Sequence, residues 1–312
     1  MRVVAIGGGT GLSTLLRGLK KFDVDISAIV AVTDEGGSSG ILRRELKVPP
    51  PGDVRNNFIA LSENEELLEK IFNFRFKDGS LKGHAVGNII LAALTMITGS
   101  LSMAIESLSE LLAIRGKIFP VSNELVRLVA EMDDGSKIIG ETNITSSGKR
   151  IKRVSLDRDV EAFPEAIMAI KEADVVILGP GSLYTSVIAN LLVKGVKEAL
   201  KESKADIIYV ANLMTQPGET SGMKLSDHLG EIEKYLERKV DLIVANSGRP
   251  PKDVLKRYEL EGYKMLQLDL ENIDREIIVG HFLKVIKDPF DGNLKVRHDP
   301  EKLAKSIIKI AR

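Results

Sequence analysis

The chain has 312 residues, enough for one large domain or two small ones. Lys plus Arg and Asp plus Glu number 44 each, so the net charge is zero, which argues against a protein whose main task is to hold nucleic acid. The absence of cysteine excludes disulfides and thiol nucleophiles, and four scattered histidines disfavour a zinc site.

No targeting or membrane-spanning segment is expected. Met1 leads directly into an apolar run at residues 3–6, without the charged start and long apolar stretch of a signal peptide. The longest apolar runs, such as residues 89–94, are too short to cross a bilayer. We therefore expect a cytoplasmic protein with no membrane insertion.

The first part of the chain has the pattern of a parallel βαβ unit. Apolar strands are expected at residues 3–6 and 26–32, with an apolar-striped helix at residues 13–21 between them. Residues 53–76 are expected to be mostly helical. Residues 85–98 predict a strongly apolar helix that is buried on most faces.

The middle of the chain changes character before the α/β rhythm returns. Short strand-like pieces lie within residues 117–157, and Asp133-Asp134-Gly135 marks a hairpin turn. Apolar strands and helical segments then alternate from residue 174, and residues 300–310 form an amphipathic helix. We predict a single α/β domain over residues 1–312. It has a Rossmann-like, doubly wound, mainly parallel sheet and a small β-rich insertion at 117–157.

A glycine-rich turn follows the first predicted strand and opens a helix. Gly8, Gly9, Thr10 and Gly11 are the candidate ligand-binding residues there, because glycines let a phosphate approach backbone N–H groups at a helix start. A Cβ at Gly9 or Gly11 is expected to occupy the phosphate's path. Leu12 replaces the third glycine of the dinucleotide fingerprint. The alternative is a tight structural turn.

A second candidate segment, TDEGGSSG at residues 33–40, begins where the second strand ends. Asp34 and Glu35 stand beside an expected flexible loop containing Gly37, Ser38 and Ser39. The acids can hold Mg²⁺, accept hydrogen bonds from a sugar or base, or act as a general base. The alternative is a pair of solvated loop acids.

Two further helix starts carry polar groups. Asp53 is expected to cap a helix whose first turn presents Arg55 and Asn56 to the same cleft. His84 opens the apolar helix, with Asn88 one turn further on. A ligand contact and a plain surface position are equally compatible with His84.

The strand–glycine turn–helix arrangement recurs at residues 179–186, and the next strand is followed by another polar segment. Two such turns on one sheet edge indicate a ligand with two polar ends, because each helix start favours negative charge. The candidate ligand-binding residues from these segments are Gly181, Ser182, Asn212, Thr215 and Gln216.

In this order, the motifs resemble the CofD-like superfamily and, within it, the YvcK-type branch of bacterial gluconeogenesis factors. The matching stretches are GGGTGLSTLLRGLK, GGSSG, PPGDVRNN, GHAVGN, LGPGSLYTS, NLMTQPGET and RHDPEKLA. The resemblance implies a Rossmann-like core, a cytoplasmic location, binding of UDP-sugars, and a role in cell morphogenesis and carbon metabolism during gluconeogenic growth. It also adds Arg297, in the RHD element, to the ligand-binding residues.

The other branch of this superfamily contains the 2-phospho-L-lactate transferase of coenzyme F420 biosynthesis. The resemblance to that enzyme implies that Asp34 and Asp53 lie near Mg²⁺ and the acceptor hydroxyl, as metal ligands and catalytic groups. The chain departs from the YvcK-type pattern at Glu35, where a second Asp is usual.

Two functions therefore stay open from the sequence. One is a nucleotide-sugar-binding regulator without turnover, and the other is a Mg²⁺-dependent transferase that joins a diphosphate-linked donor to an alcohol. The branch resemblance favours the regulator. The expected partner is a small nucleotide sugar, no nucleic acid is expected, and a homodimer is compatible with the sequence. A third function, an NAD-dependent oxidoreductase, is disfavoured by the broken fingerprint.

Overall fold

The computed structural model describes residues 1–288 and 292–311. Its strands are β1 (Arg2–Gly7), β2 (Asp25–Val30), β3 (Lys117–Pro120), β4 (Leu128–Met132), β5 (Lys137–Ile139), β6 (Ile151–Leu156), β7 (Val175–Leu178), β8 (Asp206–Val210), β9 (Leu242–Asn246), β10 (Glu276–Gly280), β11 (Leu283–Lys287) and β12 (Leu294–His298).

The α-helices are α1 (Gly9–Leu19), α2 (Gly37–Leu46), α3 (Gly52–Leu61), α4 (Glu65–Phe72), α5 (Val86–Thr98), α6 (Leu101–Leu112), α7 (Glu141–Ser146), α8 (Pro164–Glu172), α9 (Ala189–Leu191), α10 (Val196–Glu202), α11 (Leu225–Leu236), α12 (Lys252–Leu260) and α13 (Pro300–Ile310). A π-helix, η1 (Leu183–Ile188), follows β7, and a short 3₁₀-helix, η2 (Leu270–Asn272), precedes β10.

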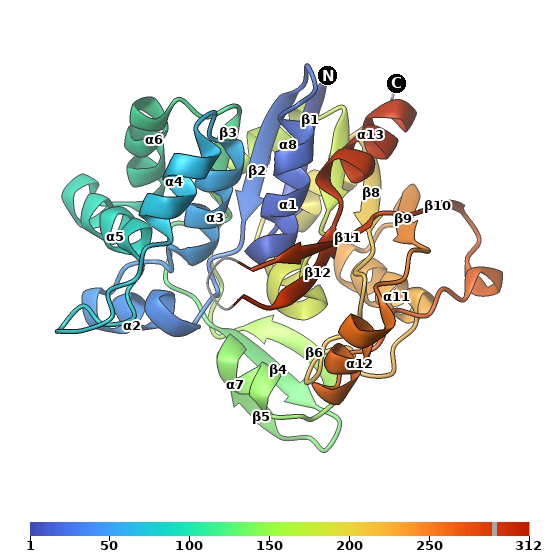
Figure 1. Ribbon diagram of the computed structural model, residues 1–312. Helices are drawn as coiled ribbons and strands as arrows, with labels where there is room; N and C mark the ends of the chain where they lie inside the picture. Colours follow the sequence, from blue (N-terminus) through green and yellow to red (C-terminus); the bar gives the residue numbers. More distant parts are fainter. Residues whose placement is uncertain (289–291, 312) are drawn as a thin grey trace.

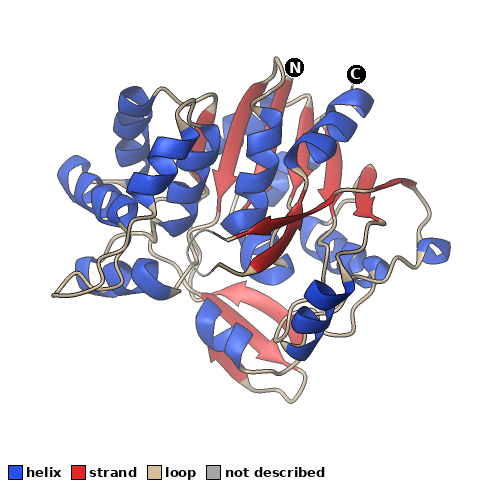
Figure 2. Ribbon diagram, in the orientation of Figure 1, coloured by secondary structure: helices blue, strands red, loops and turns tan. Residues whose placement is uncertain are grey.

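Seven strands form one parallel sheet in the order β10-β9-β8-β7-β1-β2-β3. Helices cover both faces of this sheet (Figure 2). The strands run on in one direction from β1 to β3 and in the other from β7 to β10, so the order reverses between β1 and β7. An open α/β sheet binds its ligand at such a reversal, beside the carboxyl ends of the strands. The predicted doubly wound fold is confirmed.

The buried strands and the first helix follow from their apolar patterns. Val3, Val4, Ala5 and Ile6 of β1 are all at most 2% exposed, as expected for a central strand covered on both faces. On α1, the buried leucines lie at positions 12, 15, 16 and 19, the spacing of one helical face. This face packs beside α3 and α13 on one side of the sheet (Figure 1).

The last helix is fastened closely to the first. The side chain of Asp299 caps α13 by accepting hydrogen bonds from the amides of Glu301 and Lys302. At Gly18 of α1, an added Cβ would lie 1.9 Å from the carbonyl oxygen of Pro300, so the two helices approach to backbone contact. The predicted amphipathic helix at 300–310 is confirmed.

Two small antiparallel sheets lie near the carboxyl ends of the main sheet (Figure 1). One is formed by β5, β4 and β6, with the predicted hairpin turn at residues 133–136 between β4 and β5, and the other is the hairpin of β11 and β12. The predicted insertion at 117–157 begins too early. Residues 117–120 form β3, which pairs in parallel with β2 and belongs to the main sheet.

Residues 53–76 are mostly helical, as predicted, in two helices, α3 and α4, separated at residues 62–64. A second helical expectation needs correction. Helix α5 is not buried on most faces, because Met96 and Ile97 are 59% and 78% exposed. Within the described residues no single helix is long and apolar enough to cross a membrane, although α5 and α6, bent by 117°, pass that test together.

Candidate functional site

A cavity of about 330 Å³ lies where the strand order reverses, beside the ends of β1 and β7. It is lined by Gly8, Gly9, Thr10, Gly11, Thr14, Asp34, Asp53, Glu141, Pro180, Gly181, Ser182, Thr185, Ser186, Asn212, Leu213, Met214, Gln216, Tyr258, Tyr263, Val296, Arg297 and His298. Eleven of these are sequence-predicted site residues: Gly8, Gly9, Thr10, Gly11, Asp34, Asp53, Gly181, Ser182, Asn212, Gln216 and Arg297.

The first glycine turn (Gly8–Gly11) leads from β1 into α1. Gly9 has φ +63°, the left-handed region that favours glycine, and a Cβ there would point into open space. The Gly9 amide is hydrogen-bonded to the carboxylate of Asp53. The amides of Thr10 and Gly11 have no acceptor within the described part of the chain, and α1 has neither a side-chain cap nor an acid in its first turn. This helix start therefore keeps free N–H donors facing the cavity.

Gly11 has a different role from the one the sequence indicated. An added Cβ would lie 2.4 Å from the carbonyl oxygen of Pro180, so it would collide with the second glycine turn and not with a phosphate. Gly9 is the position that stays open. The lack of a side chain at Gly11 lets the two turns touch.

The second glycine turn (residues 179–182) leads from β7 into η1. A side chain from the core binds the first turn of η1. Glu219, only 5% exposed, accepts hydrogen bonds from the amide of Tyr184 at 3.4 Å and the hydroxyl of Thr185 at 3.1 Å. Burial raises the pKa of Glu219 to about 7. A buried carboxylate therefore caps η1 from inside the protein.

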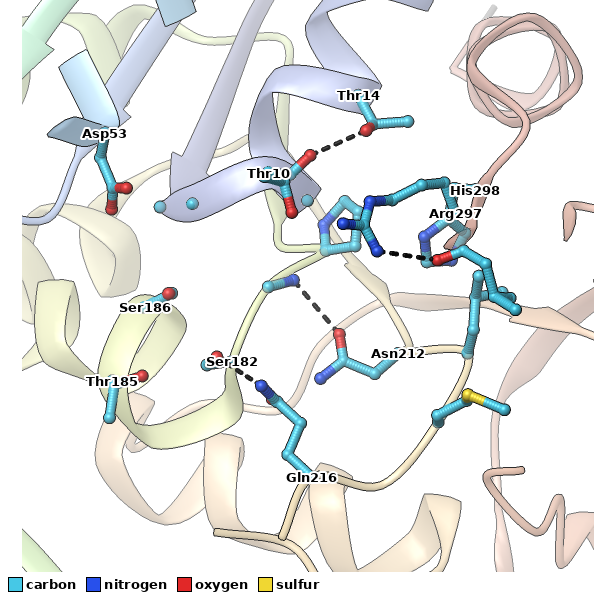
Figure 3. A pocket seen from close by; sticks show the side chains of 18 of the residues that line it. Thr10, Thr14, Asp53, Ser182, Thr185, Ser186, Asn212, Gln216, Arg297 and His298 are labelled. Carbon is cyan, nitrogen blue, oxygen red and sulfur yellow. Dashed lines mark hydrogen bonds between the residues drawn. The ribbon is translucent and has the colours of Figure 1, made fainter. Parts of the chain in front are cut away.

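Two polar side chains from the segment after β8 hold the same turn from the cavity side (Figure 3). The Gly181 amide donates to Oδ1 of Asn212 at 3.2 Å, and Nε2 of Gln216 donates to Oγ of Ser182 at 2.9 Å. Thr215 does not reach the cavity. It is 4% exposed, and its hydroxyl bonds to the backbone of Lys264.

Three carboxylates form what we call the acidic wall: Asp34, Asp53 and Glu141. Burial and then the nearby Asp34 raise the pKa of Asp53 to about 7. Burial and then Asp34 likewise raise the pKa of Glu141 to about 8. Glu141 begins α7 in the inserted subdomain, and its Oε2 accepts the amide of Glu35 at 3.2 Å.

The side chain of Glu35 is directed away from the cavity. Its Oε1 accepts a hydrogen bond from Nε of Arg127 at 2.6 Å, just before β4 of the inserted subdomain. A Cβ on Gly140 would also meet this carboxylate, at 2.0 Å from Oε2. The longer side chain at position 35 thus ties the end of β2 to the inserted subdomain.

The opposite side of the cavity, the C-terminal wall, comprises Asn212, Gln216, Arg297 and His298. In Figure 3, Asp53 lies on one side of Thr10, and Arg297 with His298 lies on the other. The guanidinium of Arg297 donates only to the Val296 carbonyl and has no carboxylate partner within the described residues. Burial lowers the pKa of His298 to about 4, so its ring is neutral at pH 7.

The predicted flexible GGSSG loop is instead the first turn of α2. Ser38 and Ser39 are 5% and 4% exposed, and they do not line the cavity. The Ser38 hydroxyl lies 3.2 Å from Nδ1 of His84, and Nδ2 of Asn88 donates to Oγ of Ser39 at 3.4 Å. These polar groups are hydrogen-bonded to one another between α2 and the start of α5.

Arg55 completes this buried network. It donates to Oδ1 of Asn88 at 2.8 Å and to Oδ1 of Asn56 at 3.0 Å, and burial lowers its pKa to about 10. The network adjoins the acidic wall, because a Cβ on Gly52 would meet both Ser39 and Asp34. The predicted site residues outside the cavity lining are therefore Gly37, Ser38, Ser39, Arg55, Asn56, His84, Asn88 and Thr215.

Some residues of this region have no strong sequence signal. Glu141 lies in the β-rich insertion, and no motif distinguishes it from the other surface acids there. Tyr258 and Tyr263 come from α12 and the loop after it, and their rings meet edge to face at 5.6 Å. Within the described residues, no three His, Asp or Glu side chains are grouped closely enough to hold a metal ion.

Known proteins are similar to this chain over nearly its whole length. The family model described as 2-phospho-L-lactate transferase CofD matches residues 3–283. A protein of Thermotoga maritima is 56% identical over the full length of both chains. The gluconeogenesis factor of Bacillus subtilis is 44% identical over 100% of this chain and 98% of that one. A crystal structure of a UPF0052-family protein from Bacillus halodurans, 46% identical, has a TM-score of 0.92 and covers 98% of this chain and 99% of its own.

Proposed function

This chain belongs to the CofD family, and on that premise we propose that it binds a nucleoside-diphosphate sugar, specifically a UDP-sugar. We further propose that it acts, without turnover, as a cytoplasmic regulator of carbon metabolism and cell morphogenesis during gluconeogenic growth. The names of its relatives as gluconeogenesis factors support the metabolic part of this proposal.

The observation that carries the proposal is the pairing of a helix start with an arginine on one cavity. The free amides of Thr10 and Gly11 at the start of α1 are suited to phosphate oxygens, because the helix dipole adds positive potential there. Arg297 lines the same cavity without a carboxylate partner in the described chain, and its planar group matches phosphate geometry. The oxygens of a diphosphate can accept hydrogen bonds from both the α1 amides and Arg297.

The aromatic residues offer a place for the base. Tyr258 and Tyr263 line the cavity together with Met214. Flat π-systems and a thioether pack well against the faces of a heterocycle. The Tyr258 hydroxyl accepts the amide of Val296 at 3.0 Å, which fixes this ring beside β12.

Isothermal titration calorimetry with UDP, UDP-glucose and uridine, each with and without Mg²⁺, tests this function. We expect UDP and UDP-glucose to bind at least about 10-fold more tightly than uridine, a difference of about 1.4 kcal/mol that reflects the phosphate contacts. Equal affinity for uridine and UDP would contradict the assignment of α1 and Arg297 to a diphosphate.

The acidic wall favours a second function, the transferase. A general base works best with a pKa near the working pH, and the pKa of Asp53 is about 7 on the cavity surface. Mg²⁺ is commonly held by one or two carboxylates plus ligand phosphates, so Asp34 and Asp53 fit a cation that arrives with the diphosphate. Such a cation would neutralise the charge of the diphosphate.

The substitution Asp34→Asn separates the two functions. In a binder, it changes affinity alone, by about 0.5–3 kcal/mol for one hydrogen bond, and UDP-glucose incubated with Mg²⁺ and alcohols stays intact. In a transferase, loss of the acid slows donor consumption by about 10²- to 10⁴-fold. Chromatography of the nucleotides gives the answer, and donor consumption by the wild type that Asp34→Asn abolishes would overturn the regulator.

A further inference from the structure

The two glycine turns differ in how an internal carboxylate is placed at the helix start. At the first turn, Asp53 takes only the Gly9 amide and itself lines the cavity. At the second turn, Glu219 takes the Tyr184 amide and the Thr185 hydroxyl from within the core, and it is not part of the cavity lining.

The second turn and the start of η1 present hydroxyl groups to the cavity. Ser182, Thr185 and Ser186 all line the cavity. The Ser182 oxygen accepts from Gln216, which leaves its own proton free to donate. Because the Thr185 proton is directed to Glu219, the Thr185 oxygen is left to accept. Such a mixture of donors and acceptors suits an alcohol better than an anion.

Charge leads to the same assignment. A carboxylate lies near each helix start, and like charges in a poorly solvated region repel strongly. At α1 the cation Arg297 lies on the other side of Thr10 from Asp53, so a phosphate there has a cation to offset the repulsion. We propose that Glu219 determines ligand specificity by making the second glycine turn a subsite for the uncharged, hydroxyl-bearing sugar, with the phosphates at α1 and Arg297. This inference rests on the proposed function and assigns its sugar half to named residues.

The contact between the two turns makes this division geometrically reasonable. Gly11 of the first turn packs directly on the Pro180 backbone of the second. A phosphate on the α1 amides is therefore a direct neighbour of a group bound by Ser182 or Ser186. In a nucleoside-diphosphate sugar, the sugar is likewise bonded directly to the terminal phosphate.

A charged sugar provides the test. We compare UDP-glucose with UDP-glucuronate, whose sugar carries a carboxylate, by calorimetry at pH 8, where Glu219 is mostly ionised because its pKa is about 7. Wild type is expected to prefer UDP-glucose. In Glu219→Gln this preference should shrink by about threefold to tenfold, because the repulsion of one charge is removed. The glutamine can still accept from the Tyr184 amide and donate to Thr185.

Two further variants keep the test decisive. Ser182→Ala should weaken UDP-glucose by about threefold to tenfold, the range of one hydrogen bond, and leave UDP unchanged. Asp269→Asn is the matched control. Asp269, only 2% exposed, also holds a helix start, through the amide and hydroxyl of Ser226, but lies outside the cavity lining. Asp269→Asn should change neither the preference for UDP-glucose over UDP-glucuronate nor the affinity for UDP-glucose relative to UDP.

The outcomes distinguish this inference from the function on which it rests. If UDP binds but Glu219→Gln leaves the sugar preference unchanged, or Ser182→Ala weakens UDP as much as UDP-glucose, the subsite assignment is overturned and the diphosphate site stands. If Glu219→Gln fails to fold, Ser182→Ala alone decides. If no uridine nucleotide binds the wild type, the proposed function fails, and the subsite fails with it.

Discussion

The acidic wall and the C-terminal wall enclose one cavity, but they differ in charge and in the number of their internal partners. On the acidic wall, Asp34, Asp53 and Glu141 stand close enough that Asp34 raises the pKa of the other two carboxyls. On the C-terminal wall, Arg297 has no carboxylate partner in the described chain, and His298 is neutral at pH 7. One wall repels an anion unless a proton or cation is supplied, whereas the other attracts it directly.

Under the proposed function, this difference orients the ligand. Phosphates gain most on the side of the α1 amides that faces Arg297, because Asp53 occupies the Gly9 amide on the other side. The acids then act on whatever accompanies the phosphates, which is a bound cation in one function and an acceptor hydroxyl in the other. Substitutions on each wall should therefore have opposite effects on an anionic ligand.

The largest effect is expected from Arg297→Ala. Loss of a charge-assisted contact to phosphate should weaken UDP binding by about 10- to 100-fold, because hydrogen bonds to charged groups contribute about 1.5–3 kcal/mol. The matched control is Lys284→Ala, which removes the cation paired across the β11–β12 hairpin from Arg297 but outside the cavity lining. Calorimetry of both variants measures the difference. A similar loss in each would assign the effect to net charge and not to the wall.

Asp53→Asn should strengthen UDP binding, the reverse of Arg297→Ala, and it should also change the pH dependence of stability. The folded-state pKa of Asp53 is about 7 against an ordinary value of 3.8, so folding retains a proton that the unfolded chain releases. Stability is therefore lost as pH rises from about 4 to about 7 and stays lower above that. At pH 8 the free energy of unfolding of the variant should exceed that of wild type by about 1 kcal/mol or more. At pH 4 the two free energies should be about equal.

Urea denaturation at the two pH values checks this prediction. Asp25→Asn is the control, because Asp25 is an exposed acid at the opposite end of the same sheet. Asp53→Asn should also tighten the binding of UDP at pH 8 in the absence of Mg²⁺, because it removes one negative charge that repels the phosphates. A destabilised Asp53→Asn at pH 8 would show that the Gly9 hydrogen bond outweighs the repulsion.

The smallest effect is expected at Glu35. Glu35→Asp shortens the side chain that reaches Arg127, and because Arg127 is 44% exposed, stability should fall by about 1 kcal/mol or less. UDP affinity should stay within about twofold of wild type, a change well below one ordinary hydrogen bond, because Glu35 is not in the cavity lining. A larger change in affinity would place Glu35 with the acidic wall.

Much of the fold and the central part of the site are readable from sequence. Continuous apolar runs predict the buried strands. A glycine turn directly after such a strand predicts Gly8–Gly11 and Gly181 as residues of the cavity. The GGSSG segment shows the limit. Small polar residues form either a loop or a helix start, and only the partners His84 and Asn88, brought in by α5, determine that Ser38 and Ser39 are buried in α2.

Long-range partners explain the other differences. The role of Gly11 depends on Pro180, and that of Glu219 on η1, so neither can be read from local pattern. Glu141 joins Asp34 only because the inserted subdomain folds over the end of β2. In each case the deciding contact joins segments that are far apart in the chain.

The docking of α13 on α1 affects the order in which parts of the site form during folding. The two helices come from opposite ends of the described chain, and Arg297 precedes α13 by only a short stretch of β12. Closing so long a loop is entropically unfavourable, and such non-local contacts form slowly. Until α13 docks on α1, Arg297 is not held beside the first glycine turn. Under the proposed function, the chain is therefore expected to gain its affinity for a diphosphate late in folding.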